Sequence, residues 1–173
     1  MKSIVYWILL TPVFGLMTFH QGHSQVSPEE FVDPKSSRTT SIFNISPISF
    51  GTFYPGKMGG EVSMHPSGMR ESTGSVILLP NKTPYMPAIF EIRAPSQTMI
   101  QVIYQNEVRL TGSDGGYLIF RPGPVDNGNP FITPPNSENG FLLTMGGVLE
   151  LGSIDQNPSG NYSGSFHITL VNE

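Results

Sequence analysis

From residue 41 onwards the sequence is a succession of short apolar runs, each ended by glycine, proline or asparagine, and this pattern restricts the fold most. Within the runs, apolar residues recur at every second position, as in Ala88–Arg93 (AIFEIR) and Met99–Tyr104 (MIQVIY). A period of two places alternate side chains on opposite faces of a strand. No window after residue 40 has the apolar spacing of an amphipathic helix. The pattern therefore predicts a domain built of short strands.

The strand pattern recurs often enough for a complete antiparallel domain. The expected strands cover residues 42–53, 61–64, 75–79, 88–93, 99–104, 107–110, 117–120, 141–145, 148–151 and 162–171. About eight to ten short strands at this spacing predict an all-β sandwich, with an open barrel as the alternative. The segment 121–140 holds five prolines and is expected to be one irregular loop, because proline cannot donate to a strand ladder.

The charge and the absence of cysteine exclude several functions. The formal net charge is −4, so the chain has no basic surface for nucleic acid or for an anionic membrane. Without cysteine there are no disulfides, no thiolate metal sites and no cysteine nucleophile. We expect no nucleic-acid partner and no cofactor, and a fold stabilised by its core and its backbone pairing.

The N-terminus has the layout of a secretory signal peptide. A lysine at the second position precedes an apolar stretch over residues 4–19. Gly22 and Ser24 place small side chains at the spacing that predicts cleavage before Gln25, with Val26 as the alternative first residue. The apolar stretch is short and has no cationic residue on its far side, which disfavours a membrane anchor.

The chain is therefore expected to have three parts. Residues 1–24 form the signal peptide, residues 25–40 a flexible polar leader, and residues 41–173 the β-sandwich domain. No later segment is long and apolar enough to span a bilayer. We expect an exported protein located in the periplasm, at the cell surface or outside the cell.

Three pieces of sequence carry a family resemblance. The first is ISFGTF at 48–53 with GGEV at 59–62 and PSG at 66–68, the second is GGVLELG at 146–152, and the third is PSGNYSGSF at 158–166. Their order and spacing resemble the bacterial exported family called domain of unknown function 4402, from about residue 42 to the end. The third piece is also similar to the last strand of spore-coat-U-type and archaic chaperone–usher pilin subunits.

The resemblance implies an immunoglobulin-like sandwich in an envelope or surface protein, often from Gram-negative bacteria, and implies no particular activity. We expect a non-catalytic protein that takes part in adhesion or assembly, with a protein or glycan at the cell surface as its partner and self-assembly as a further option. The alternatives are a pilin-like (fimbrial) subunit completed by donor-strand exchange and an accessory carbohydrate-binding module.

The residues of these motifs are expected to define the fold. The glycine pairs at 59–60 and 146–147 are predicted to supply positive φ at reversals or bulges. Tyr162 is predicted to pack its ring in the sandwich while its hydroxyl bonds to a nearby backbone group. The full set of residues expected to define the fold is Gly51, Gly59, Gly60, Gly146, Gly147, Gly160, Tyr162 and Gly164.

Residue types used in catalysis occur, but not in catalytic patterns. His65 and Ser67 share a turn, where neighbouring side chains rarely face each other, and His167 falls on the outer face of the last strand. The carboxylates are scattered singly, whereas glycoside cleavage requires a pair. Asp114 and the run at 126–129 (DNGN) offer oxygen ligands for calcium, but they lack EF-hand spacing and also fit ordinary turns. We expect neither an enzyme nor a metal site.

Aromatic residues in the proline-rich loops are the remaining candidates for binding. Tyr85 and Phe131 both lie beside prolines in segments that are expected to be loops. An aromatic ring in such a position offers a large contact area to a protein or a glycan. Tyr85 and Phe131 are therefore the predicted binding surface.

The leader at 25–40 bears on whether the sandwich is complete. It holds two prolines and several charged residues, so we expect it to fill an apolar groove poorly and to contribute little to stability. The long alternating run at 162–171 can pair at the end of the chain. The sequence therefore favours a sandwich that is complete by itself.

Overall fold

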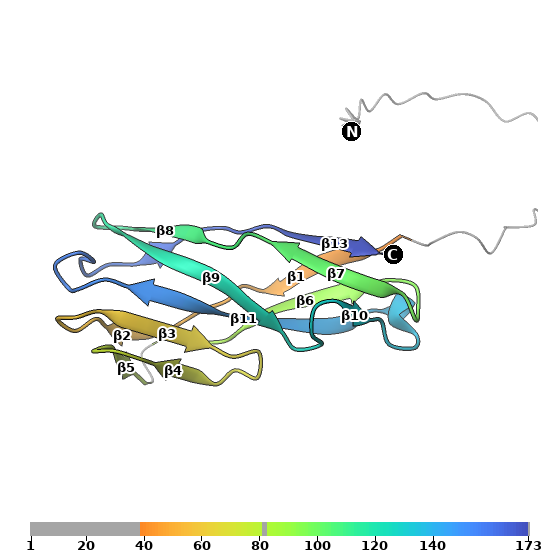
Figure 1. Cartoon of the computed structure of the whole chain (residues 1–173), viewed down its shortest axis with the longest axis horizontal. Helices are drawn as coiled ribbons and strands as arrows, with labels where there is room; N and C mark the ends of the chain where they lie inside the picture. Colours follow the sequence, from red (N-terminus) through yellow and green to blue (C-terminus); the bar gives the residue numbers. More distant parts are fainter. Residues whose placement is uncertain (1–38, 81–82, 173) are drawn as a thin grey trace, which may run out of the picture. The chain divides into compact units, whose positions relative to one another are not determined.

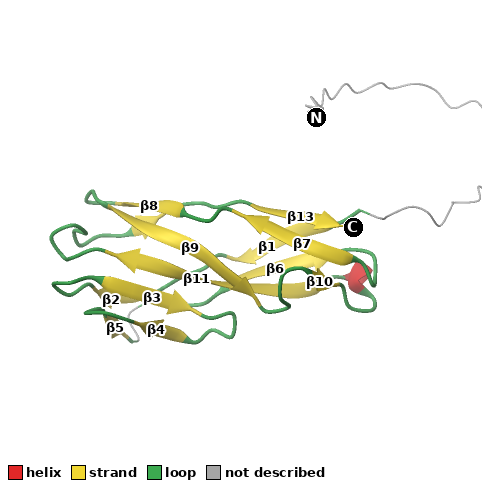
Figure 2. Cartoon of the chain, in the orientation of Figure 1, coloured by secondary structure: helices red, strands yellow, loops and turns green. Residues whose placement is uncertain are grey.

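The computed structural model describes residues 39–80 and 83–172, and these form antiparallel sheets joined by loops (Figure 1). The predicted all-β sandwich class is confirmed. Figure 2 shows strands throughout and one short 3₁₀-helix. The predicted signal peptide and nearly all of the leader lie outside the described residues. In the described residues, no helix is long and apolar enough to cross a membrane.

The described residues hold thirteen strands, more than the eight to ten expected. The expected first and last strands are each divided in two, and two short strands, β4 and β10, have no alternating pattern to reveal them. The elements are β1 (Ser41–Ser46), β2 (Thr52–Tyr54), β3 (Gly60–Met64), β4 (Arg70–Ser72), β5 (Ile77–Leu79), β6 (Ala88–Arg93), β7 (Met99–Tyr104), β8 (Val108–Gly112), β9 (Tyr117–Val125), β10 (Phe131–Ile132), η1 (Ser137–Asn139), β11 (Phe141–Leu151), β12 (Tyr162–Ser163) and β13 (Ile168–Asn172).

Strand β11 is the central strand of the largest sheet. The first half of β11 pairs with β6 and its second half with β3, while β9 runs along its other edge. The order across this sheet is β1-β6-β11-β9-β8-β12, with β4 beside β3. Because all these pairs are antiparallel, every strand can expose one face and bury the other.

Two smaller sheets complete the domain. One has the order β10-β7-β13 and the other consists of β2 and β5. The chain passes from β7 to β8 and from β12 to β13 between sheets, so that β12 pairs with β8 and β13 with β7 (Figure 1). The sequence at 162–171 is continuous in its alternation, but the crossover divides it into two strands.

The core consists of two clusters of buried side chains. The first lies among β6, β7 and β11, where the alternating residues Phe90, Ile92 and Ile100 point inward. The second lies among β3, β8, β9 and the end of β11, with Phe120 among its most buried members. The two-residue period of the sequence thus produces the buried faces directly.

The segment 121–140 is not one irregular loop. β9 continues through Pro122 and Pro124 to Val125, and β10 and η1 follow. Beyond Phe120, β9 pairs with β11 but no longer with β8. This part of β9 is therefore an edge, where a proline without an N–H is tolerated.

The two glycine pairs have different roles. Gly59 and Gly60 have φ of 68° and 149°, as predicted for a reversal that leads into β3. Gly146 and Gly147 do not have positive φ, so that part of the prediction is wrong. They lie inside β11 at the register shift against β9, and a Cβ on either glycine would collide with a neighbouring strand. Close approach of backbones, rather than a reversal, requires glycine there.

Candidate functional site

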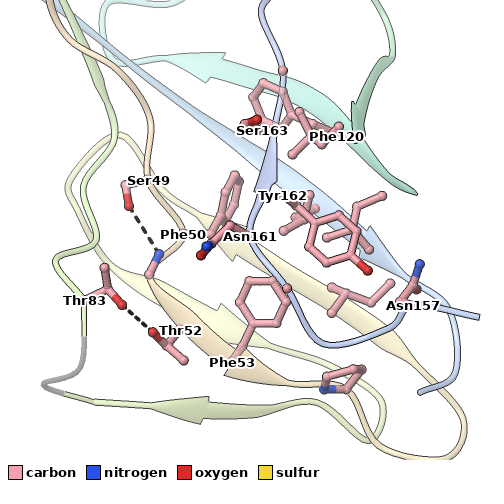
Figure 3. Close-up of a pocket in the computed structure, with 18 of the residues that line it drawn as sticks. Ser49, Phe50, Thr52, Phe53, Thr83, Phe120, Asn157, Asn161, Tyr162 and Ser163 are labelled. Atoms are coloured by element: carbon pink, nitrogen blue, oxygen red, sulfur yellow. Dashed lines mark hydrogen bonds between the residues drawn. The ribbon is translucent and has the colours of Figure 1, made fainter. Parts of the chain in front are cut away.

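An apolar groove of about 650 Å³ opens between two segments of the domain (Figure 3). Residues 47–55, which include β2, form the β2 wall, and residues 157–164, which include β12, form the β12 wall. The groove floor consists of apolar side chains from β8, β9 and β11: Val108, Leu110, Leu118, Phe120, Leu149 and Leu151. Among the described residues that line the groove, none is charged.

Three phenylalanines connect the two walls through the groove floor. The ring of Phe120 meets Phe50 of the β2 wall edge-on at 5.7 Å between centroids, and meets Phe166, just past β12, at 5.5 Å. Edge-to-face contacts of this kind add stability beyond the area that they bury. Phe50, Phe53 and Tyr162 are seen around the opening in Figure 3. The second core cluster therefore continues directly into the groove.

The β12 wall is fixed by the motif PSGNYSGSF. The Tyr162 hydroxyl donates to the carbonyl of Pro158 at 2.6 Å, which is the type of backbone bond expected from the sequence. Burial, and to a lesser extent the nearby charge of Asp114, raises the pKa of Tyr162 above its ordinary value. Gly164 lets the wall approach β8, because a Cβ there would lie 2.7 Å from Leu110 Cδ2.

Strand β12 uses one of its backbone edges to pair with β8. The Ser113 N–H donates to the Asn161 carbonyl at 2.9 Å, and the Asn161 N–H donates to the Ser113 hydroxyl at 3.1 Å. Successive residues of an antiparallel strand direct their N–H and C=O to opposite edges. Those of Tyr162 therefore point away from β8. In the described sheets, β12 has β8 as its only neighbour, so this edge is open to a further strand.

The β2 wall is also a strand edge. β2 pairs with β5 alone among the described strands, and β5 does not line the groove. Arg70 of β4 supports the wall: its Nη1 donates to the carbonyls of Phe50 at 2.7 Å and Thr52 at 3.4 Å. Two strand edges thus face each other across an apolar floor. Whether the sandwich is complete by itself stays a prediction.

Tyr85 and Phe131, the two predicted binding aromatics, have different surroundings. Tyr85 is 44% exposed, and its ring stacks under the Arg70 guanidinium at 4.1 Å from the centroid. Its role in binding stays a prediction. Phe131 is only 6% exposed and packs edge-on against Phe141 in the first core cluster. The prediction for Phe131 is wrong, because β10 pairs with β7 and turns this ring inward.

His65 and Ser67 do face each other, contrary to expectation. The His65 Nδ1 lies 2.9 Å from the Ser67 hydroxyl and also accepts the Ser67 N–H at 3.2 Å. Both bonds stay inside one turn, which they stabilise. His167 is exposed on the chain between β12 and β13. In the part of the chain that the structure describes, no group of three His, Cys, Asp or Glu residues could hold a metal.

The oxygens of the DNGN run are used to hold the fold. Asp126 Oδ1 accepts the N–H groups of Asn127 and Thr144. The Asn129 side chain accepts the N–H of Val102 and donates to its carbonyl, both at 2.8 Å. These side chains bond to separate backbone positions and do not converge on one point, so the ordinary-turn interpretation fits them.

Sequence reasoning missed several residues that build the groove. Asn157 is buried, with its amide bonded to the N–H of Gly152 and to the carbonyl of Tyr117. Arg70 belongs to a short strand without an apolar pattern. Asn157 immediately precedes the PSGNYSGSF motif, and this position could have drawn attention to it. The motif alone does not indicate an edge strand.

Comparisons with known proteins place the chain in a family. Neither the curated proteins nor the solved structures include a match. The model of the family described as "Domain of unknown function (DUF4402)" matches residues 40–171. This match spans both walls of the groove, its floor and all thirteen strands apart from the last residue of β13. The chain belongs to the DUF4402 family.

Proposed function

We propose that this chain is an exported, non-catalytic protein of the cell envelope that assembles with a partner by taking an extended strand into the groove. The observation that carries the proposal is the pair of edge strands, β2 and β12, on either side of an apolar floor. An added strand gains main-chain hydrogen bonds from an edge and specificity from the pockets that receive its alternate side chains.

The same proposal covers the pilin-like alternative, in which a neighbour completes the sandwich. Open apolar edges are also sites of aggregation unless they are covered. A strand in this groove would cover the floor and satisfy the backbone of Tyr162. The similarity of the last motif to pilin subunits agrees with this mode of assembly and is part of the proposal.

The groove fits a glycan less well. Sugars stack on exposed faces of aromatic rings. Phe50 and Phe120 are both buried and meet edge-on, and the side-chain amide of Asn157 is already bonded within the fold. The groove floor therefore offers apolar side chains and no exposed ring face, which suits the side chains of a polypeptide strand.

A labelled peptide tests the proposal. The peptide alternates valine with threonine or serine and carries a lysine at each end for solubility, and its binding to the mature protein is followed by fluorescence anisotropy. Methylating its amide nitrogens at every second residue should weaken binding for either set of alternate residues, because successive residues of a strand that lies between two edges donate to opposite sides. The proposal would be overturned if neither methylation pattern changed the affinity, or if the peptide did not bind at all.

Matched variants locate the site on the protein. Leu110→Lys places a charge on the groove floor and should weaken peptide binding at least about tenfold. Leu142→Lys is the control, because Leu142 is 58% exposed on the outer face of β11. Thermal unfolding of both variants verifies that they fold. Equal loss of binding in the two variants would remove the groove as the binding site.

A further inference from the structure

We infer that the groove receives an uncharged strand from a different protein, and that residues 25–40 of a second copy of this chain do not fill it. The inference rests on the proposed function and names the kind of partner that it requires. Its basis is the chemistry of the lining. The described residues of both walls and of the floor are apolar or neutral, with hydroxyl, amide and backbone groups as their polar atoms.

A charged side chain that enters this groove would lose water, and the described residues that line the groove offer no charged partner. Burial of an unpaired charge is costly, and an ion pair is needed to offset it. Arg70 bonds to two carbonyls of the β2 wall and stacks on Tyr85, so its guanidinium is already engaged. The side chains that enter the groove must therefore be neutral.

The leader of this chain does not meet that requirement in either strand register. Only every second side chain of a strand points to one face, so residues 25–40 can place either their even-numbered or their odd-numbered side chains in the groove. The even set contains Glu30 and Arg38, and the odd set contains Glu29, Asp33 and Lys35. Every run of five alternate residues in the leader would thus bring at least one charge into the groove.

Prolines add a second obstacle. Pro28 and Pro34 have no N–H, and a strand between two open edges needs its donors on both sides. Other uncharged strands of this chain, such as β1 and β13, are already paired with β6 and β7. A neutral alternating strand from another protein is the occupant that the lining fits.

Competition between two peptides tests the inference. The labelled neutral peptide described above is displaced from the mature protein by unlabelled neutral peptide or by a peptide of residues 25–40. We expect the leader peptide to compete at least about tenfold more weakly. A leader peptide with Glu29, Glu30, Asp33 and Lys35 replaced by threonine or valine, and both prolines by serine, should recover part of this difference.

The outcomes separate the two proposals. If the leader peptide competes as well as the neutral peptide, the inference is wrong and the proposed strand binding stands. If the mature protein alone forms multimers that Leu110→Lys dissolves and Leu142→Lys does not, a second copy is the partner, which also overturns the inference. If the neutral peptide itself fails to bind, the proposed function fails first.

Discussion

Phe120 and Phe166 meet edge-to-face, with their ring centroids 5.5 Å apart. Phe120 comes from β9 in the groove floor, whereas Phe166 comes from the crossover that leads the chain from β12 to β13. The contact therefore couples the stability of the core to the position of the β12 wall. Loss of either ring should affect both.

The first prediction concerns this contact. Phe120→Ala should lower the free energy of unfolding by about 3–5 kcal/mol, because it leaves a cavity in a well-packed cluster. Phe166→Ala should cost less, since Phe166 is only half-buried. Urea unfolding measures both, with the exposed Leu142→Ala as a control that should stay within about 0.5 kcal/mol of wild type. A Phe120→Ala cost no larger than that of Leu142→Ala would contradict the assigned packing.

The second prediction concerns the tyrosine of the β12 wall. Tyr162→Phe removes the bond to Pro158 and should cost about 0.5–1.5 kcal/mol at neutral pH. The pKa of Tyr162 is raised in the folded state above its ordinary value of 10.0. Its contribution is therefore complete below pH 10.0 and is lost as the pH rises through the folded-state pKa.

Thermal melts between neutral and strongly alkaline pH check this sign. The wild type should lose more stability than Tyr162→Phe over the alkaline range. An equal alkaline loss in both proteins would show that Tyr162 is not the group that titrates.

The third prediction concerns acid stability. The carboxylate of Glu138 accepts the N–H and the hydroxyl of Ser96, both at 2.9 Å, and these bonds lower its pKa below the ordinary value of 4.5. The stabilising effect is present above pH 4.5 and is lost as the pH falls through the lowered pKa. The difference in Tm between wild type and Glu138→Gln should therefore close in acid. A difference that is constant from neutral pH into acid would contradict the assignment.

The fourth prediction separates support of the β2 wall from ordinary surface charge. Arg70→Gln loses two bonds to wall carbonyls and the stacking on Tyr85, so it should cost about 1–3 kcal/mol and weaken binding of the neutral peptide. Arg93→Gln is the matched control, because Arg93 forms an exposed pair with Glu91 that is worth about 1 kcal/mol or less. Similar peptide affinity in the two variants would show that Arg70 does not contribute to peptide binding in the groove.

The fifth prediction concerns export. Protein recovered from outside the cytoplasm should begin at Gln25 or Val26, because the apolar stretch before it has the layout of a cleaved signal. Intact-mass spectrometry of the recovered protein decides this. A mass that still includes Met1 would contradict both the cleavage and the proposed export route.

The strands that were predicted best are those whose alternation matches a single buried face. β6 and β7 begin and end at the predicted residues, because each has one side against the first core cluster throughout. β9 was predicted to end at Phe120, since Pro122 and Pro124 read as loop residues. Their place on an unpaired edge depends on where β8 begins and ends, and local sequence does not carry that information.

The groove was harder to predict for the same reason. The motif around Tyr162 indicated a strand with a corner tyrosine, and the structure has both. Whether another strand lies beside it depends on the whole topology. Phe131 was misplaced because the prolines around it suggested an exposed loop, whereas a two-residue pairing with β7 is enough to bury its ring.

The carboxamide of Asn129 limits how copies of the domain can associate. By bonding both the N–H and the C=O of Val102, it blocks the rim of β7 beside β10 as a template for fibril-like addition. A domain that caps one of its own sheet edges with a side chain keeps that edge from accepting a strand, so two copies do not join along it.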